Sequence, residues 1–404
     1  MAWLQKLALL VVALLPCIAA VPIVNSKNHP DLLTEGKYII TLQDSLSPSE
    51  FKAHISRISA VQYRNSLGRK QQGYSGIQKT YAIGDFRAYA GAFDKDTIQA
   101  IRNDTKVAEV EPDAIYTLQG STEFQHNAPW GLAALSSKRR NTATYKYDKS
   151  AGNGTFAYIL DSGINVKHVE FEGRASNGYN SINNDFTDVN GHGTHVAGII
   201  GSKTFGVAKK ANLIAVKVFL NNESMISFIL EGFEWAINDI RTKGRQSRSV
   251  INMSLGGKFS PALNRAVESA FSMGIATVVA AGNGAHPVRS TSPASAPNAL
   301  TVGAIDADWN EWEYSNFGPE VNILAPGVQI ESTFISTDTA TRKLTGTSMA
   351  APHVAGLALY LAALEDFETP AKMRERILSL GTKDRIRGLK NENPNLIANN
   401  GARK

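Results

Sequence analysis

The chain carries the stretch GTSMAAPH at residues 346–353, directly before the apolar run at 354–364. Small residues around Ser348 leave its hydroxyl uncrowded, and the apolar run predicts a helix that begins at this serine. The free amides of a first helical turn carry partial positive charge and can stabilise a developing oxyanion. Ser348 is therefore either a nucleophile mounted on a helix or an ordinary N-cap serine. A base and an orienting acid elsewhere in the chain would favour the nucleophile.

Two further motifs supply such partners. The segment YILDSG at 158–163 is an apolar run that ends in an acid, which predicts a buried parallel strand with Asp161 at its carboxyl end. The segment NGHGTHVAG at 190–198 is a glycine-rich turn before an apolar helix, and His192 is its candidate base. The chain order Asp, His, Ser is that of subtilisin and differs from the orders in chymotrypsin and the α/β-hydrolases.

Together, DSG, GHGTHVAG and GTSMAAPHVAG resemble the motifs of the subtilase family. Segments at 127–132, 170–175 and 206–211 are similar to its proteinase K-like secreted fungal branch, so the resemblance covers about residues 127–364. It implies an α/β fold, namely a subtilisin-like doubly wound parallel sheet with helices on both faces. It also implies a serine endopeptidase whose catalytic residues are Asp161, His192 and Ser348.

The chemistry of these residues is consistent with that activity. His192 would take the proton of Ser348 during attack, and Asp161 would hold the imidazole tautomer and stabilise the imidazolium. The segment AAGNG at 280–284 follows the apolar run 275–281, and Asn283 resembles the family's oxyanion donor. An Asn-Gly pair is also a common turn. With the three motifs present, the catalytic interpretation of Asn283 is favoured.

The substrate pocket is expected between two segments. The run VINMSLGG at 250–257 predicts a buried strand that opens into glycines, which allow close approach of a peptide backbone. The resemblance implies two uncharged pocket walls, which predict an apolar or aromatic residue before the scissile bond. The residues of these walls are Ser254, Leu255 and Gly256 on one side and Ala280, Ala281 and Gly282 on the other.

A second edge strand for the peptide is expected after residues 217–219. The family usually has small, glycine-rich residues there that pair with the substrate by β-addition. This chain has NNESM at 221–225 instead. The outer-subsite preferences of the relatives are therefore not transferred to it.

The beginning of the chain is typical of a secreted protein. Residues 1–20 combine Lys6, an apolar core at 7–15 and small residues, which predicts a signal peptide too short to span a bilayer. The only cysteine, Cys17, would leave with it. The mature protein is thus expected to be extracellular, with no membrane partner and no disulfide. Relatives usually have disulfides, and their cysteine after GHGTH is Val196 here, so packing must provide stability.

A segment of different character lies between the signal and the peptidase domain. Residues 21–120 are predicted to be a propeptide, with an inhibitor-like α/β domain at about 37–117, before a peptidase domain at 121–404. Strands are expected at 37–42, 86–93 and 107–113, and helices at 47–61 and 97–101. This pattern resembles the subtilase propeptide inhibitor, which implies that the propeptide is an intramolecular inhibitor. An independent binding domain is the alternative.

The propeptide would be cut between residues 118 and 126. If the cleavage is autocatalytic, an apolar residue is expected at the cut, and Tyr116, Leu118 and Phe124 are the candidates.

The remaining histidines and charges give less specific signals. His192 and His195 do not form a metal pair in this interpretation, because no third ligand motif and no HExxH pattern accompany them. His195 and His353 are expected to pack near the site, and His168 and His286 to lie in surface loops. From residue 121 onward, 29 Lys and Arg stand against 25 Asp and Glu, and this mildly basic balance implies no nucleic acid partner. The basic group at 374–390 is expected to be a solvated face.

Glycosylation and calcium binding can also be predicted. Sequons occur at Asn103, Asn153, Asn222 and Asn252, and the last lies in a predicted buried strand where a glycan does not fit. No cofactor is required for catalysis, and the identity of any metal is unknown. Relatives bind a structural calcium ion with carbonyls matching 297–299 and an aspartate, and the matching position here is Asn322. An amide in place of a carboxylate predicts a weaker site or none.

Three function classes follow from these observations. A catalytically silent, binding-only subtilase fold would be expected to lack a triad residue or the oxyanion donor, and all four are present. An esterase or lipase would carry a GxSxG elbow, which these motifs do not contain. The favoured class is a secreted monomeric endopeptidase that cleaves proteins or peptides and is made as a self-processed zymogen.

Overall fold

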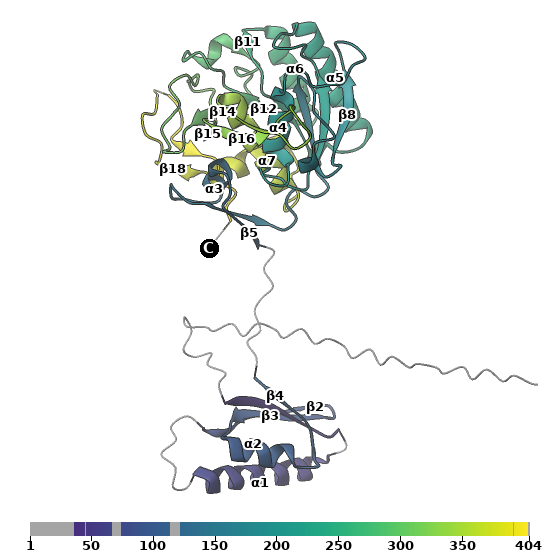
Figure 1. The fold of residues 1–404 in the computed structure, drawn as a ribbon, viewed down its shortest axis with the longest axis vertical. Helices are drawn as coiled ribbons and strands as arrows, with labels where there is room; N and C mark the ends of the chain where they lie inside the picture. The colour runs from purple at the N-terminus through teal and green to yellow at the C-terminus, as the bar shows by residue number, and fades with distance from the viewer. Residues whose placement is uncertain (1–35, 45, 67–73, 114–121, 391, 403–404) are drawn as a thin grey trace, which may run out of the picture. The chain divides into compact units, whose positions relative to one another are not determined.

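The computed structural model describes residues 36–44, 46–66, 74–113, 122–390 and 392–402. The predicted signal peptide with Cys17, and the candidate cleavage residues Tyr116 and Leu118, lie outside the described residues. The chain divides into two compact units, 1–119 and 120–404, and each is described by itself (Figure 1). Within the described residues, every helix is too short or too polar to span a bilayer.

The N-terminal unit is a four-stranded antiparallel sheet with two helices. The order of its strands is β2-β3-β1-β4, and the elements are β1 (Lys37–Leu42), α1 (Pro48–Ser66), β2 (Gly76–Ile83), β3 (Phe86–Ala92), α2 (Lys95–Arg102) and β4 (Val107–Pro112). The sequence predicted five of these six elements. Strand β2 was not predicted, because its residues are mostly exposed and give a weak alternating pattern.

A nine-stranded sheet forms the centre of the second unit, in the order β18-β19-β15-β14-β12-β10-β7-β9-β8. All neighbours run parallel except β18 and β19. Its strands are β7 (Phe156–Asp161), β8 (Ala175–Asn180), β9 (Asn212–Lys217), β10 (Ser249–Met253), β12 (Ala276–Ala280), β14 (Leu300–Ile305), β15 (Ile323–Pro326), β18 (Thr382–Lys383) and β19 (Leu396–Ile397).

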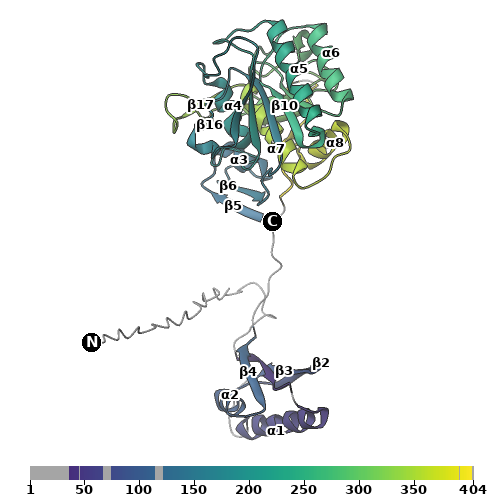
Figure 2. The same cartoon turned by 90° about the vertical axis from the view of Figure 1, so that its right-hand side faces the viewer.

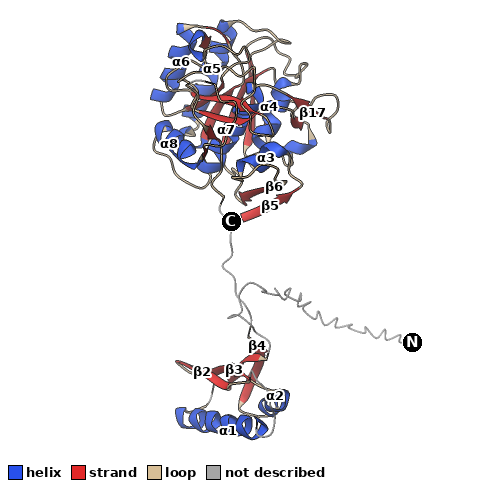
Figure 3. Cartoon of the chain, turned by 90° about the vertical axis from the view of Figure 1, so that its left-hand side faces the viewer, coloured by secondary structure: helices blue, strands red, loops and turns tan. Residues whose placement is uncertain are grey.

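Helices cover both faces of this sheet (Figures 2 and 3). They are α3 (Trp130–Leu135), α4 (His192–Gly201), α5 (Ile226–Thr242), α6 (Pro261–Ser272), α7 (Thr347–Ala362) and α8 (Pro370–Leu380). Alternate residues of β7 enter different cores: Ala157 and Ile159 pack with residues of α4 and α7, and Tyr158 and Leu160 with residues of α5 and α6. A strand buried on both faces is a continuous apolar run, as the sequence predicted, and the doubly wound fold is confirmed.

Short paired strands complete the second unit. They are β5 (Thr122–His126) with β6 (Thr144–Asp148), β11 (Gly257–Lys258) with β13 (Thr291–Ser292), and β16 (Ile330–Thr333) with β17 (Thr341–Leu344). Short 3₁₀ turns lie at Val169–Phe171, Gln246–Arg248 and Val288–Ser290.

Candidate active site

The site forms where neighbouring parallel strands end. Asp161 is the last residue of β7, Ser254 follows β10, and Ala281 follows β12. These three strands are adjacent in the order β12-β10-β7, so their carboxyl ends meet at one edge of the sheet. Helix α4 begins at His192 and α7 begins one residue before Ser348. The fold thus brings the three predicted catalytic residues together around a single cavity, about 250 Å³ in volume.

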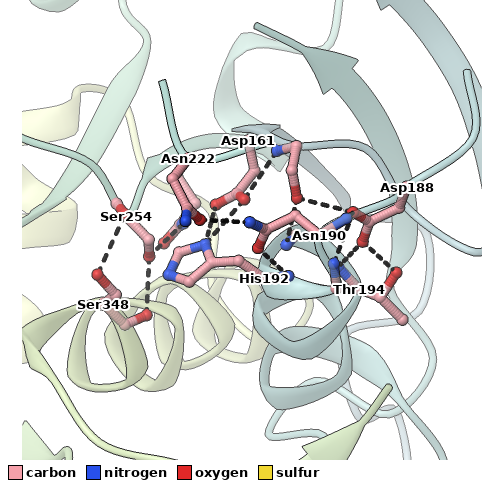
Figure 4. A network of polar contacts seen from close by, with 12 residues as sticks. Asp161, Asp188, Asn190, His192, Thr194, Asn222, Ser254 and Ser348 are labelled. Carbon is pink, nitrogen blue, oxygen red and sulfur yellow. Dashed lines mark hydrogen bonds and ion pairs between the residues drawn. The ribbon is translucent and has the colours of Figure 1, made fainter. Parts of the chain in front are cut away.

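His192 and Asp161 are in direct contact. Nδ1 of His192 lies 2.8 and 2.9 Å from the two carboxylate oxygens of Asp161, which is only 3% exposed (Figure 4). Burial lowers the pKa of His192, but the charge and hydrogen bond of Asp161 outweigh this, so the pKa is raised above its ordinary value. The pair therefore favours an imidazole that accepts a proton at Nε2.

Ser348 lies on the same cavity with its hydroxyl turned toward the backbone. Its Oγ donates to the carbonyl of Ser254 at 3.2 Å, and Ser254 Oγ donates back to the carbonyl of Ser348 at 2.9 Å (Figure 4). Attack on a substrate requires the Ser348 hydroxyl to turn from this carbonyl to Nε2 of His192. Catalytic hydrogen bonds often form fully only once substrate is bound.

Asn283 is held in one orientation by the start of α7. Its Oδ1 accepts from the amide of Thr347 at 2.9 Å and from the hydroxyl of the same residue at 2.7 Å. The described residues provide no acceptor for its Nδ2, which lies 3.2 Å from the position of a Cβ on Gly346. Because Oδ1 is engaged, the donor end of the amide is free to bind an oxyanion beside Ser348.

The predicted pocket walls surround a second cavity of about 460 Å³, and Ser348 lies on its rim as well. Five of the six predicted wall residues line it: Leu255, Gly256, Ala280, Ala281 and Gly282. Ser254 lines the neighbouring 250 Å³ cavity instead. The expectation of an uncharged pocket is incomplete, because Lys258 and His286 line the larger cavity too. Lys258 directly follows the Gly256-Gly257 pair, so its position at the pocket could have been predicted from the sequence.

Asn316 supports the loop that carries Asn283. It is 1% exposed; its Nδ2 donates to Ala281 and its Oδ1 accepts from the amides of Gly284 and His286. A Cβ on Gly282, where φ is +105°, would lie 2.3 Å from Nδ2 of Asn316. This position therefore requires glycine. Asn316 could not be predicted from the sequence, because its role depends on contacts with residues distant in the chain.

The predicted edge strand after residue 219 is wrong. Leu220 and Glu223 pair with each other, and the chain turns at Asn221, whose φ is +53°. Asparagine tolerates this left-handed conformation, which explains why the Asn221-Asn222 pair makes a turn instead of a strand. The turn lines the cavity of the triad, and Nδ2 of Asn190 donates to Oδ1 of Asn222 at 2.5 Å.

Three other histidines have structural contacts. Burial lowers the pKa of both His195 and His353 to about 4, and each ring bonds a backbone carbonyl, which confirms their packing role. The prediction of a surface position for His168 is wrong: it is 1% exposed and its Nε2 contacts the carbonyl of Ala340 at 2.9 Å. His286 is exposed, as predicted.

Two residues of the expected calcium position have hydrogen-bond partners within the protein. Oδ1 of Asn322 accepts from the amide of Thr301 at 2.8 Å and so joins two strands. The guanidinium of Arg374 donates to the carbonyl of Pro297 at 3.3 Å, which puts a cation at an expected ligand. Across the described residues there is no group of three or more acidic, histidine or cysteine side chains that could hold a metal.

The sequons and the basic group differ in exposure. Asn103, Asn153 and Asn222 are exposed, and Asn252 is fully buried in β10. Three members of the basic group, Lys383, Arg385 and Arg387, are exposed, and Arg374 and Arg376 are half-buried. Lys390 is half-buried as well. Its ammonium donates to the backbone carbonyls of Trp312, Glu313 and Ser315 at 3.2, 2.7 and 2.6 Å, because this segment folds back on the sheet.

Comparison with known proteins agrees with this geometry. A model described as "Subtilase family" matches residues 152–393, a range that contains Asp161, His192, Asn283 and Ser348. This chain belongs to the subtilase family. A second model, described as "Peptidase inhibitor I9", matches residues 37–119 and identifies the N-terminal unit as an inhibitor propeptide.

Relatives resemble this subtilase over nearly its whole length. It is 47% identical to "Alkaline protease 1" of Aspergillus flavus, over 98% of this chain and 99% of that protein. It is 46% identical to "Subtilisin-like proteinase Mp1" of Magnaporthiopsis poae, over 98% of both. The crystal structure of a cold-adapted subtilisin-like serine proteinase has a TM-score of 0.64 and 34% identity, covering 69% of this chain and 100% of that one. The protein is a subtilisin-like serine endopeptidase with an inhibitor propeptide.

Proposed function

We propose that Asp161, His192 and Ser348 are the catalytic triad of this endopeptidase and that Asn283 is its oxyanion donor. The observation that carries the proposal is the 2.8 Å contact of His192 with Asp161 in the cavity that also contains Ser348. Isolated ion pairs occur in many structures, but here the free Nε2 of the histidine and a serine at a helix start share one cavity.

The proposed reaction has two halves, acylation of Ser348 and hydrolysis of the acyl-enzyme. Each of the four groups acts once in each half. Ser348 Oγ attacks the carbonyl carbon of the scissile bond while Nε2 of His192 takes its proton. The carbonyl oxygen becomes an oxyanion that accepts from Nδ2 of Asn283, and Asp161 stabilises the imidazolium. His192 then protonates the leaving amine as the C–N bond breaks. Water hydrolyses the resulting ester of Ser348 by the same steps.

The preferred residue before the scissile bond is proposed to be apolar or aromatic. The lining of the 460 Å³ cavity, to which Ser348 also contributes, includes Leu255, Ala280, Ala281 and Ala294, which supports burial of an apolar side chain. Lys258 adds a positive charge to this lining and His286 adds a polar ring, so a long side chain meets polar groups there.

The protein is further proposed to be a secreted, monomeric zymogen. The predicted signal sequence at 1–20 and the inhibitor propeptide support this life history. Exposed Asn103, Asn153 and Asn222 are its candidate glycosylation sites. Because Asn322 and Pro297 are engaged within the protein, we expect stability without calcium at this position: a chelator should leave the thermal midpoint unchanged, and a large drop would contradict this.

Mass spectrometry of the secreted product tests the triad and the maturation together. A serine-directed fluorophosphonate label is added to the wild-type protein and to Ser348→Ala, with Ser272→Ala, at an exposed serine on α6, as the control. We expect the wild type and the control to be shortened to about residue 121 and labelled, and Ser348→Ala to be unlabelled and to retain residues 21 onward. A wild type that has lost its propeptide but takes no label would overturn the proposal.

A further inference from the structure

The backbone amides at the start of the helix that carries His192 all donate hydrogen bonds to side chains outside the helix. Helix α4 has ten residues, and His192 is the first of them. The amides at a helix start have no partner within the helix, and they require acceptors elsewhere when they are buried. All four have one here: the amides of Gly191, His192, Gly193 and Thr194 donate to Asp188 Oδ1, Asn190 Oδ1, Ser162 Oγ and Asp188 Oδ2 at 2.8, 3.1, 3.0 and 3.0 Å.

Asp188 is the centre of this arrangement. Its carboxylate is buried, and the residue is 4% exposed. Five donors point at it: the amides of Asn190, Gly191 and Thr194 and the hydroxyls of Ser162 and Thr194 (Figure 4). It forms no ion pair with any described residue, so its charge is balanced by these donors and by the positive end of the helix dipole.

Ser162 connects this carboxylate to the end of β7. Its Oγ donates to Asp188 at 2.9 Å and accepts from the amide of Gly193 at 3.0 Å. Ser162 is also the neighbour of Asp161 and donates its own amide to that carboxylate at 2.8 Å. The end of the strand that carries Asp161 and the start of the helix that carries His192 are therefore joined by bonds that meet at Asp188.

We propose that Asp188 is a positioning residue for the catalytic base. Its carboxylate holds the loop before α4 and the end of β7 in the relative position that places Nδ1 of His192 on Asp161. Its buried negative charge, near the imidazole, also stabilises the imidazolium that forms when Ser348 gives up its proton. Asp188 does not contact the reacting atoms, so it acts through His192.

The charged groups around His192 agree with this role. They are Asp161 at the end of β7, Asp188 in the loop before the helix, and His195 one turn further along α4. Both carboxylates act to raise the pKa of His192, Asp161 more than Asp188, and they outweigh the opposing effect of burial. His195 stays neutral near pH 7, because burial lowers its pKa to about 4.

The test is Asp188→Asn in the full-length chain, which keeps the shape of the side chain and removes its charge. Asp185→Asn is the matched control, because Asp185 lies in the same loop, is exposed and carries the same charge. Rates with a peptide anilide are divided by the number of active sites titrated with a fluorophosphonate. For Asp188→Asn, we expect kcat to fall by about tenfold or more with KM within about twofold, since small misplacements of a base have effects of this size. The acidic limb of the pH profile of kcat/KM should move to lower pH, because Asp188 acts to raise the pKa of His192. The control should keep the wild-type kcat and the wild-type pH profile.

Ser162→Ala keeps the charge of Asp188 and removes the hydrogen bonds that the Ser162 hydroxyl makes to Asp188 and Gly193. It is therefore the second test if Asp188→Asn is not processed to the mature enzyme. A severalfold lower kcat with unchanged KM in Ser162→Ala would then support the proposal. An unchanged kcat in Ser162→Ala, when Asp188→Asn does not mature, would show that Asp188 serves folding alone. A mature Asp188→Asn with wild-type kcat and the acidic limb in place would also overturn the proposal, whatever its thermal midpoint.

Discussion

The two units of this chain bury their sheets differently. In the inhibitor unit, residues of both helices pack with one face of an antiparallel sheet, in a core that includes Ile40, Ile58 and Ile101, and much of β2 stays exposed (Figure 3). In the peptidase unit, helices cover both faces, and every residue of β10 is buried. Small units bury a smaller fraction of their surface and are correspondingly marginal. We therefore expect the inhibitor unit to have the smaller reserve of stability.

The two units each hold a histidine next to a carboxylate, buried in one unit and half-buried in the other, and the pKa values of the two shift in opposite directions. His54 in the inhibitor unit lies 3.0 Å from Asp104, and His192 in the peptidase unit lies 2.8 Å from Asp161. Burial, with the charges of Arg57 and Lys106, lowers the pKa of His54 to about 4, whereas the pKa of His192 is raised. A nearby carboxylate is thus not sufficient to make a base: burial and the surrounding charges together decide the direction of the pKa shift.

The largest expected effect concerns the difference in core size. In a Ser348→Ala background, which keeps both units in one chain, Ile58→Ala and Ile200→Ala each remove a fully buried side chain. Each should lower the free energy of unfolding of its own unit by about 2–5 kcal/mol. Denaturant unfolding should show that Ile58→Ala leaves the inhibitor unit largely unfolded in water and that Ile200→Ala does not unfold the peptidase.

Ile83→Ala is the control in the inhibitor unit, because Ile83 is 71% exposed. Equal shifts of both unfolding transitions in Ile58→Ala would mean that the two units do not unfold separately, and the comparison would fail.

The next largest effect concerns the proteolytic cleavage that separates the two units. Asn283→Leu keeps the approximate volume and removes the proposed oxyanion donor, so kcat should fall by about 10²–10³, or about 2.7–4 kcal/mol. Autocatalytic removal of the inhibitor unit should slow to a similar degree. Peptidase assays and a time course of the precursor by mass spectrometry measure both rates. Asn153→Leu, at an exposed asparagine outside the cavity, should change neither rate, and wild-type kinetics in Asn283→Leu would contradict the oxyanion role.

Acid should weaken the inhibitor unit through His54. Its pKa in the folded unit is about 4, below the ordinary 6.5, so the unfolded chain binds more protons between these values. The contribution of neutral His54 to stability is fully present above pH 6.5 and is lost as the pH falls toward 4, up to about 3 kcal/mol. The measurement is the free energy of unfolding of this unit against pH, in the Ser348→Ala chain with and without His54→Gln. Equal pH dependence in the two chains would show that other groups titrate.

The smallest effect concerns the charge at the substrate pocket. Lys258→Met should lower the ratio of kcat/KM for glutamate over glutamine before the scissile bond by about fivefold, since one exposed charge contributes about 1 kcal/mol. Lys138→Met, an exposed lysine that does not line the pocket, should leave the ratio unchanged. A ratio that is also unchanged in Lys258→Met would place its ammonium outside the reach of the substrate.

Much of the fold could be predicted because its signals are local. The apolar run that ends in Asp161 and the glycine-rich turns before His192 and after Asn283 each reflect one strand or helix end. Strand β2 and the buried state of His168 could not be predicted in this way. Both depend on the element that packs against them, and a mostly exposed strand has no strong apolar period.

Alone, the sequence determined the chain order of the proposed acid, base and nucleophile, and the alternation of strands and helices that delivers them. Those features are carried by residue types at short spacing. Tertiary structure decided what surrounds these groups: the five donors on Asp188, Lys258 and His286 in the substrate cavity, and the turn at Asn221. The physical reason is that burial, charge and hydrogen bonding depend on neighbours brought together by folding, and these decide which carboxylate or histidine is active.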